Sequence, residues 1–345
     1  MEIINLRSDT VSMPSAAMRK VMYDAEVGDD YYRADPTVHR LQEKAAGVLG
    51  KESALLVLSG TMGNLTSILA QTSRGDSMIV ESRAHIANLE AGNVAVAGGV
   101  TLRAITAERG RLAPSQVEAA ILPRGVVVHP PTTLVAIENT HMSTGGFCIS
   151  PAETNAVANV AHRHGLRVHL DGARLFNAAV AQNVTPAALA AGVDSVTFCF
   201  SKGLGCPAGS IVAGEEAFIE RARHWRQMLG GGMRQAGIIA AAGIFALDNM
   251  VDRLSEDHAN AQLMHQLLKS HGLATSDEVE TNIVYVDLPP APFDPGRLMQ
   301  GLQSRGIVIN SPRGGRIRFV THCDVSRDAI KRAAPLVAAA FGEAA

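Results

Sequence analysis

The sequence predicts an α/β fold in which helices cover both faces of a mostly parallel sheet. Short apolar runs, such as residues 77–81 (SMIVE) and 195–201 (SVTFCFS), alternate with helix-like stretches over much of the chain. These runs are almost continuously apolar, which is typical of strands that are buried on both faces. The chain has 345 residues, of which 47% are hydrophobic, so one large or two moderate domains can form.

The alternation begins with a helix, a strand and a second helix. Residues 36–50 (PTVHRLQEKAAGVLG) start with a proline, which is favoured in the first turn of a helix. Residues 53–59 (SALLVLS) predict a buried strand and residues 61–72 (TMGNLTSILAQT) a helix. Further strands are predicted at residues 77–81, 133–138, 166–171 and 195–201, and further helices at 115–122, 151–165 and 173–183.

Near residue 250 the pattern changes to that of a smaller α+β domain. A long helical stretch at residues 249–272 precedes strand-like residues 281–288, a helix at 295–306, a strand at 317–322 and a last helix. We therefore expect a large domain over residues 1–250, which includes an N-terminal arm over residues 1–13, and a small C-terminal domain over residues 251–345.

Charge and cysteine content narrow the class of protein. The net charge is −2, and basic residues are scattered among as many acids, so no nucleic-acid partner is expected. No run approaches the roughly 18 apolar residues of a membrane-spanning helix, and we expect a cytoplasmic protein without a membrane partner. The four cysteines have no metal-ligand spacing, which predicts free, mostly buried thiols and no metal site.

A single lysine, Lys202, follows directly after the strand-like run at residues 195–201. A lysine at a strand end often only extends its amine to solvent. Here Ser201, Gly203 and Gly205 flank it, at the carboxyl end of a strand, where ligands bind in α/β sheets. A desolvated lysine amine is also a nucleophile that forms Schiff bases with aldehydes.

Two more features precede Lys202 along the chain. Asp171 ends a predicted strand and could simply cap the helix that follows, but a carboxylate there could also keep a pyridine nitrogen protonated. Ser59, Gly60 and Thr61 lie between a strand and a helix, where free N–H groups favour an anion, although such residues are also ordinary helix caps. Together with Lys202, they suggest pyridoxal 5′-phosphate as the cofactor.

Several sequence blocks in one order resemble the low-specificity L-threonine aldolases, which are fold-type I pyridoxal-phosphate enzymes. The blocks include LRSDTVSMPSAAM, SGTMGN, RAHI, IENTH, HLDGARLFNAAVA, SKGLGCPAGS and RFVTHCDVS, and they span essentially the whole chain. The resemblance implies a large domain with a mostly parallel seven-stranded sheet between helices and a small C-terminal α+β domain.

The resemblance also assigns roles to individual residues. It implies that Lys202 forms the Schiff base, that Asp171 faces the pyridine nitrogen, and that Gly60 and Thr61 hold the phosphate. His85 would stack on the cofactor ring, although a lone histidine is more often a hydrogen-bonded structural residue. The substrate carboxylate would be bound by Ser8, Arg174 and Arg318, because the planar arginine fork suits a carboxylate.

Two further assignments concern the substrate side chain and the subunit contact. His141 resembles a second active-site histidine near the substrate side chain. Arg234 resembles a residue that reaches the phosphate of a neighbouring subunit, which implies a homodimer or homotetramer with shared active sites.

The implied activity is the reversible aldol cleavage of L-threonine, L-allo-threonine and related β-hydroxy amino acids to glycine and an aldehyde. His85 would remove the proton of the β-hydroxyl group, directly or through water. Some positions depart from the family pattern and put the side-chain preference in question, namely Tyr31, Arg33, Ala34, Met142 and Cys206.

Other functions remain open at this stage. A different pyridoxal-phosphate reaction, such as β-elimination or racemisation of a small amino acid, would use the same Lys202 and Asp171. A catalytically silent binding protein with the same fold is disfavoured by the intact candidate residues. A nicotinamide dehydrogenase is excluded because no GxGxxG motif follows the first predicted strand.

Overall fold

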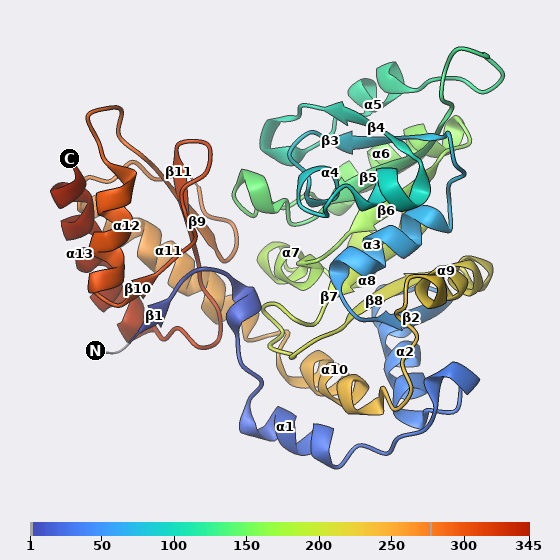
Figure 1. The fold of residues 1–345 in the computed structure, drawn as a ribbon, viewed down its shortest axis with the longest axis horizontal. Coiled ribbons are helices and arrows are strands. Elements are labelled where there is room, and N and C mark those ends of the chain that lie inside the picture. Colours follow the sequence, from blue (N-terminus) through green and yellow to red (C-terminus); the bar gives the residue numbers. More distant parts are fainter. Residues whose placement is uncertain (1–2, 277) are drawn as a thin grey trace.

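A seven-stranded sheet organises the first three quarters of the protein (Figure 1). The computed structural model describes residues 3–276 and 278–345. The strand order is β2-β8-β7-β6-β5-β3-β4, and every neighbouring pair is parallel except those that involve β8. The strands are β2 (Ser53–Val57), β3 (Ser77–Glu81), β4 (Thr101–Ile105), β5 (Thr132–Glu138), β6 (Arg167–Asp171), β7 (Ser195–Cys199) and β8 (Ser210–Gly214). The predicted α/β class and the mostly parallel sheet are confirmed.

Helices lie on both faces of this sheet (Figure 1). In β2, Leu55 and Val57 pack under α9, whereas Leu56 belongs to the larger core on the other face, as the two-residue period of a strand requires. The helices are α1 (Ala16–Tyr23), α2 (Pro36–Leu49), α3 (Gly60–Leu69), α4 (His85–Asn88), α5 (Pro114–Ala120), α6 (Pro151–Arg163), α7 (Leu175–Gln182), α8 (Pro186–Ala190), α9 (Glu216–Met228) and α10 (Gly237–Asn249). Short helical turns are η1 (Asp9–Val11), η2 (Asp30–Tyr32), η3 (Val94–Gly98), η4 (Glu108–Gly110) and η5 (Met142–Thr144).

The C-terminal part has its own core, to which the N-terminus contributes. Its elements are α11 (Leu254–Ser270), β9 (Ile283–Asp287), α12 (Pro295–Ser304), β10 (Ile307–Val308), β11 (Arg316–Val320) and α13 (Arg327–Ala344). Strand β1 (Ile4–Asn5) pairs with β10, and Ile4 and Leu6 pack into this second core. The N-terminal arm therefore joins the C-terminal unit, while the division of the chain at residue 250 stays a prediction.

Most predicted elements form close to their expected bounds, and the differences have local causes. The helix expected from residue 249 begins at Leu254, because residues 250–253 form a turn after α10. Strand β8 was not foreseen, since five apolar residues after a glycine-rich loop do not distinguish a strand from other buried segments. Its insertion between β7 and β2 is what makes the sheet mixed.

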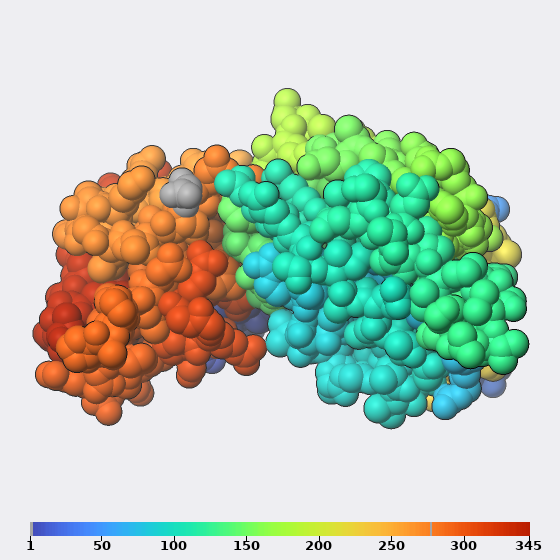
Figure 2. Space-filling model, turned by 90° about the horizontal axis from the view of Figure 1, so that it is seen from above, coloured from blue at the N-terminus to red at the C-terminus, as the bar shows by residue number. Residues whose placement is uncertain are grey.

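The carboxyl ends of β5, β6 and β7 meet at one edge of the sheet. Glu138 is the register partner of Asp171, and Asp171 is in turn the partner of Thr197. This edge faces the C-terminal unit, and Figure 2 shows a hollow where the orange C-terminal segments meet the cyan segments of the large unit. The topology therefore brings the predicted strand-end residues to one place.

The structure also bears on two expectations from composition, namely that the cysteines are free, mostly buried thiols and that no helix spans a membrane. The four cysteines are free thiols, and only Cys323 is partly exposed, as the sequence predicts. Burial raises the pKa of the Cys148 and Cys206 thiols. Within residues 3–276 and 278–345, no helix is both long and apolar enough to cross a membrane.

Phe198, on β7, contacts two other aromatic rings edge to face in the main core, and we expect the loss of its side chain to be costly. Phe198 is fully buried, with its ring 5.0 Å from that of Phe176 and 4.9 Å from that of Phe200. Phe198→Ala should lower the free energy of unfolding by about 3–5 kcal/mol, because it leaves a cavity as well as removing apolar contacts. Urea denaturation measures this loss. Val127→Ala, at a side chain that is 99% exposed, is the control and should change stability by less than about 0.5 kcal/mol.

Candidate active site

Lys202 and Asp171 lie at the same edge of the sheet. Asp171 is the last residue of β6, and Lys202 follows three residues after the end of the adjacent strand β7. Lys202 is half-buried, and the hydroxyl of Ser12 donates a hydrogen bond of 2.9 Å to its backbone carbonyl. The N-terminal arm therefore contacts the turn that carries the lysine.

The carboxylate of Asp171 is buried among neutral donors. It is 1% exposed; Oδ1 accepts from the backbone N–H of Ala173 at 3.1 Å and Oδ2 accepts from Nδ2 of Asn64 at 2.9 Å. Among the described residues, no lysine or arginine lies within ion-pair distance of this carboxylate. A buried anion without a paired cation is costly, so a protonated ring nitrogen fits this position.

The N-terminus of α3 lies against the end of β7. Ser59 caps the helix by accepting from the N–H of Met62 at 3.2 Å. A Cβ atom added at Gly60 would lie 2.5 Å from Sγ of Cys199, so only glycine allows this approach. The N-terminus of α3, with the N–H groups of Gly60 and Thr61, thus lies at the end of the strand that precedes Lys202, and such a helix start suits an anion such as a phosphate.

His85 is the first residue of α4, which begins four residues after the end of β3. Its backbone N–H donates to Oε2 of Glu138 at 2.6 Å, and its Nδ1 lies 2.8 Å from Oε1 of Glu90. Burial of the ring opposes its protonation, but the hydrogen bond to Glu90 and the charge of Asp171 outweigh this and raise the pKa of His85. The charge of Lys202 acts on this ring in the opposite sense and lowers the pKa of His85.

Arg174 is held by a residue that the sequence analysis did not single out. Its Nε donates to Oδ2 of Asp9 at 2.7 Å and its Nη2 to Oδ1 at 2.5 Å. Asp9 is fully buried; burial alone would raise its pKa, but the Arg174 guanidinium reverses this and holds the pKa well below the usual range. Asn282 of the C-terminal unit also donates to Asp9, at 3.1 Å.

Ser8 and Arg318 lie next to this pair. The hydroxyl of Ser8 donates to Oδ1 of Asp9 at 3.3 Å. Arg318, on β11, is half-buried, and its guanidinium contacts the backbone carbonyl of Arg7 and the sulfur of Met142. Burial and the like charge of Arg174 lower the pKa of Arg318. The structure therefore brings Ser8, Arg174 and Arg318 together, with two positive groups close to each other.

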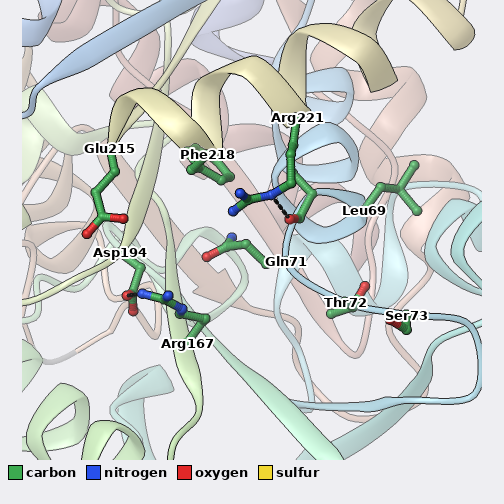
Figure 3. A pocket seen from close by; sticks show the side chains of 10 residues that line it. Leu69, Gln71, Thr72, Ser73, Arg167, Asp194, Glu215, Phe218 and Arg221 are labelled. Atoms are coloured by element: carbon green, nitrogen blue, oxygen red, sulfur yellow. Dashed lines mark hydrogen bonds and ion pairs between the residues drawn. The ribbon is translucent and has the colours of Figure 1, made fainter.

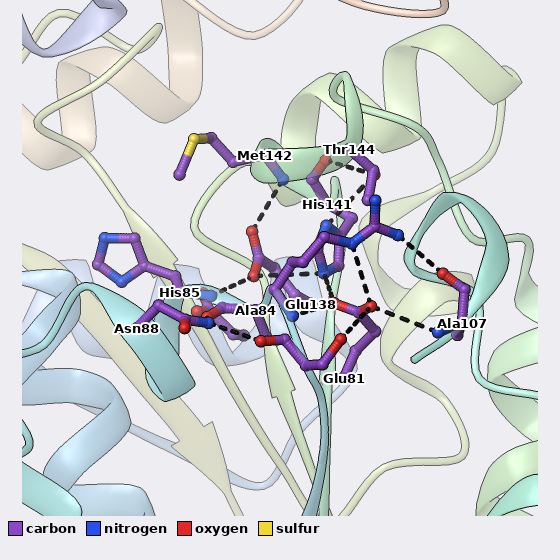
Figure 4. Close-up of polar contacts among 12 residues, drawn as sticks. Glu81, Ala84, His85, Asn88, Ala107, Glu138, His141, Met142 and Thr144 are labelled. Carbon is purple, nitrogen blue, oxygen red and sulfur yellow. Dashed lines mark hydrogen bonds and ion pairs between the residues drawn. The ribbon is translucent and has the colours of Figure 1, made fainter. Parts of the chain in front are cut away.

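His141 lies among Glu81, Glu138 and Thr144 (Figure 4). Its ring is fully buried, with Nε2 3.0 Å from Oε2 of Glu81 and 3.9 Å from Oε2 of Glu138. Gly110, at φ +79°, packs so closely that an added Cβ would lie 2.3 Å from Cγ of His141. Burial opposes protonation of this ring, yet the two carboxylates raise its pKa.

Glu138 connects the two histidine-bearing loops. Its Oε2 accepts from the N–H of His85, and its Oε1 accepts from the N–H of Met142 at 2.8 Å (Figure 4). A single buried carboxylate therefore fixes the start of α4 and the start of η5 relative to each other. Met142, one of the departures from the family pattern, is thereby placed beside Arg318.

Arg234 lies in the loop before α10 and is largely exposed. Its side chain is 58% exposed, with Nη1 3.3 Å from Oδ2 of Asp29, and its guanidinium lies 4.6 Å from the ring centre of Tyr31. The departures at Arg33 and Ala34 belong to the same segment, and Arg33 forms an ion pair with Glu220. Among the departures, Tyr31 therefore contacts Arg234, whereas Met142 contacts Arg318.

The residues that support the site are those that the sequence analysis missed. Asp9 adjoins Ser8 in the LRSD block, but nothing local shows that it pairs with an arginine 165 positions away. Others are buried polar residues in strands, in a helix or, for Glu90, in a loop, where the sequence carries no distinct signal, namely Asn64, Glu81, Glu90, Glu138 and His169.

One pocket among the described residues, drawn in Figure 3, lies apart from this edge. It encloses about 400 Å³ and is lined by residues at and after the end of α3, at the start of β6, just before β7 and in the first half of α9, including Arg167, Asp194 and Arg221. Since β6 and β7 begin here, whereas β6 ends at Asp171 and β7 ends three residues before Lys202, this pocket lies at the opposite end of the strands.

Comparisons with known proteins agree with this arrangement. The chain matches the beta-eliminating lyase family over residues 5–290. The low-specificity L-threonine aldolase 1 of Arabidopsis thaliana is 41% identical over 332 residues, covering 94% of this chain and 93% of that protein. The low specificity L-threonine aldolase of Escherichia coli is 40% identical, covering 96% and 97%. The solved structure of Leishmania major threonine aldolase has a TM-score of 0.83 at 18% identity, covers 98% of this chain and 99% of that one, and shows the shared fold.

The buried histidine next to this site predicts how stability depends on pH. Burial lowers the pKa of His169 to about 4, whereas an unfolded histidine titrates near 6.5. Between these values the unfolded chain binds more protons, so this part of the stability is complete above about pH 6.5 and is lost as the pH falls toward 4. We expect a loss of about 2–3 kcal/mol from this residue.

Urea denaturation at pH 7, 6, 5 and 4 measures this slope. His169→Gln should flatten it, because glutamine does not titrate. His258→Gln is the comparison, since burial also lowers the pKa of His258 to about 4. An unchanged slope in His169→Gln would contradict a neutral histidine at this position.

Proposed function

The chain belongs to the beta-eliminating lyase family and, within it, to the low-specificity L-threonine aldolases, and on that premise we propose the following activity. The protein cleaves L-threonine, L-allo-threonine and related L-β-hydroxy-α-amino acids to glycine and an aldehyde, and it catalyses the reverse addition. The observation that carries this proposal is the convergence of Lys202, Asp171 and His85 at one edge of the sheet.

Enzymes of this family use pyridoxal 5′-phosphate, and the residues at this edge fit that group. Lys202 would bind its aldehyde carbon, Asp171 would face its ring nitrogen, and the N–H groups at Gly60 and Thr61 would hold its phosphate. His85 would lie on its ring, and Arg174 would border it. When bound, the group withdraws electrons from the bonds at Cα of the substrate. The unpaired, buried carboxylate of Asp171 is the feature that a cationic ring would complement.

Ser8, Arg174 and Arg318 suit the substrate carboxylate. Asp9 occupies Nε and Nη2 of Arg174, which leaves Nη1 of the same guanidinium for a second anion. Arg318 contacts only neutral atoms among the described residues, and a carboxylate would relieve its repulsion from Arg174. A carboxylate held by both arginines keeps the rest of the amino acid in one orientation.

His85 is the candidate base for the β-hydroxyl proton. Its raised pKa makes it a stronger proton acceptor than an isolated imidazole. We propose that His141 acts indirectly, since its buried ring lies against Glu81 and Glu138, and Glu138 in turn orders the backbone of His85 and Met142.

The exposed side chain of Arg234 is the basis for a proposed subunit assembly. We propose a homodimer or homotetramer in which Arg234 reaches the phosphate site of a neighbouring subunit. Its exposed side chain and its weak contacts with Asp29, at 3.3 and 3.4 Å, leave it available to a partner. A cytoplasmic location remains a prediction from the sequence.

Replacing the lysine tests the proposed chemistry. Lys202→Ala should lose the yellow colour of the cofactor-loaded protein and lower glycine release from L-threonine by at least about 100-fold, because the amine that binds the cofactor is gone. Absorbance spectra and assays of glycine and acetaldehyde measure both effects. Lys20→Ala, on the exposed face of α1, is the control. Formation of 2-oxobutyrate in place of acetaldehyde by the wild type would instead indicate β-elimination.

Replacing Arg318 tests the proposed binding of the substrate carboxylate. Arg318→Ala should raise KM for L-threonine about 10- to 100-fold, because a charge-assisted hydrogen bond contributes roughly 1.5–3 kcal/mol. Arg316→Ala, two residues earlier on β11, removes a side chain that pairs with Asp287 at 2.7 Å and should leave KM unchanged. Equal effects of the two substitutions would point to a structural role of the strand.

A further inference from the structure

A buried amide connects the two carboxylates behind the candidate site. Asn64, on α3, donates through Nδ2 to Oε1 of Glu90 at 2.8 Å and to Oδ2 of Asp171 at 2.9 Å. All three side chains are buried. Because an ionised carboxylate only accepts hydrogen bonds, the amide nitrogen has to face both acids.

The other side of the amide fixes the same orientation. Oδ1 of Asn64 lies 3.1 Å from Nε2 of His169, so this nitrogen carries a proton. In a neutral ring Nδ1 then accepts, and it lies 2.9 Å from the hydroxyl of Ser195, which in turn accepts from Nε2 of Gln71 at 2.7 Å. Each donor in this chain meets an acceptor, and the chain ends on Glu90 and Asp171.

Glu90, which Asn64 holds in place, in turn contacts the ring of His85. Oε1 of Glu90 accepts the hydrogen bond from Nδ2 of Asn64 and lies 2.8 Å from Nδ1 of His85. The side chain of Glu90 is fully buried, whereas that of His85 is 30% exposed. Figure 4 shows the His85 ring directed away from Glu81, Glu138 and His141. Since Nδ1 faces the buried acid, the exposed edge of the ring carries Nε2.

The pairing of Nδ1 with a carboxylate determines which nitrogen exchanges protons. When the pair has lost its proton, Glu90 is ionised and requires a donor, so the neutral ring holds its hydrogen on Nδ1. In this tautomer Nε2 carries the free lone pair, so a proton that the pair gains binds to Nε2. The exchangeable proton therefore enters and leaves through Nε2, wherever the remaining proton lies between Nδ1 and Oε1.

The charges around the pair do not all act alike: those of Glu90 and Asp171 raise the pKa of His85 and that of Lys202 lowers it, and the rise prevails. His85, Glu90 and Asp171 each place one polar atom within 4.8 Å of the others, and Lys202 and the backbone contact with Glu138 complete the surroundings of the ring. Burial raises the pKa of Glu90, and the charge of Asp171 adds to this rise. A proton on the pair is thus favoured while Asp171 is ionised.

We propose that Glu90 and Asn64 are positioning residues that hold His85 with Nδ1 protonated and thereby make Nε2 the atom that exchanges a proton with the substrate. Asn64 holds Glu90 beside Asp171, and Glu90 holds the ring. The catalytic part of this inference rests on the proposed function, whereas the tautomer of His85 is a property of the protein without cofactor or substrate.

The direct test follows the His85 ring by ¹⁵N NMR in the cofactor-free protein. In the wild type the neutral ring should carry its hydrogen on Nδ1, and its pKa should lie above the ordinary value. Glu90→Gln removes the charge but keeps the shape, and it should lower the pKa of His85 by about one unit or more. Glu81→Gln is the matched control, because it changes a buried acid beside the other histidine, His141, and should leave the His85 titration unchanged.

Asn64→Ala should shift the pKa of His85 in the opposite direction to Glu90→Gln. It removes a donor from the Glu90 carboxylate, so the proton should be held more tightly by the pair and the pKa of His85 should rise. In the loaded enzyme, Glu90→Gln should lower kcat for L-threonine about 10- to 100-fold with less than about a threefold change in KM, and the acidic limb of the pH profile should move with the NMR titration. Glu90→Asp should recover part of kcat.

The outcomes separate this inference from the proposed function. A neutral His85 protonated on Nε2, or an unchanged titration in Glu90→Gln, overturns the inference even if the enzyme cleaves threonine. If Glu90→Gln shifts the His85 titration but leaves the pH dependence of kcat unchanged, the role of Nε2 in the reaction is overturned. Absence of glycine release from the loaded wild type, with the expected tautomer and shifts, contradicts the proposed function and leaves the positioning of His85 supported.

Discussion

The buried ion pair between Asp9 and Arg174 is the constraint on which the arrangement of the site depends. It joins the N-terminal arm to the segment that follows β6, and Asn282 adds the C-terminal unit to the same carboxylate. Neither charge could be buried alone, because each would lose its hydration without compensation. The pair therefore fixes three distant parts of the chain around Lys202, whose charge also acts on Asp9.

The buried acids at the sheet edge are compensated in different ways, and this difference separates their roles. Asp9 pairs with a permanent cation, Glu81 and Glu138 receive backbone N–H groups and lie beside His141, and Glu90 lies beside His85. Asp171 has only neutral donors. The position that lacks a cation is the one where a charged ligand stabilises the protein most.

Strand ends were predictable from the sequence because apolar runs and their polar termini are local features. The runs that end at Asp171 and near Lys202 become β6 and β7, and the rule that ligands bind at the carboxyl ends of parallel strands placed both residues together. The supporting residues were not predictable in this way. Asn64 and Asp171 are 107 positions apart, and neither helical nor strand periodicity indicates that an amide on α3 contacts a carboxylate on β6.

The sequence by itself determined the fold class, the family and the residues that carry the proposed chemistry, because these depend on local patterns and on motifs in a fixed order. Only the tertiary structure decided that His141 is enclosed by Gly110 and two acids, that Asp9 occupies part of Arg174, and that Asn64 orients Glu90 toward His85. These contacts depend on strand register and on how helices pack against the sheet, and such packing is a property of the whole folded chain.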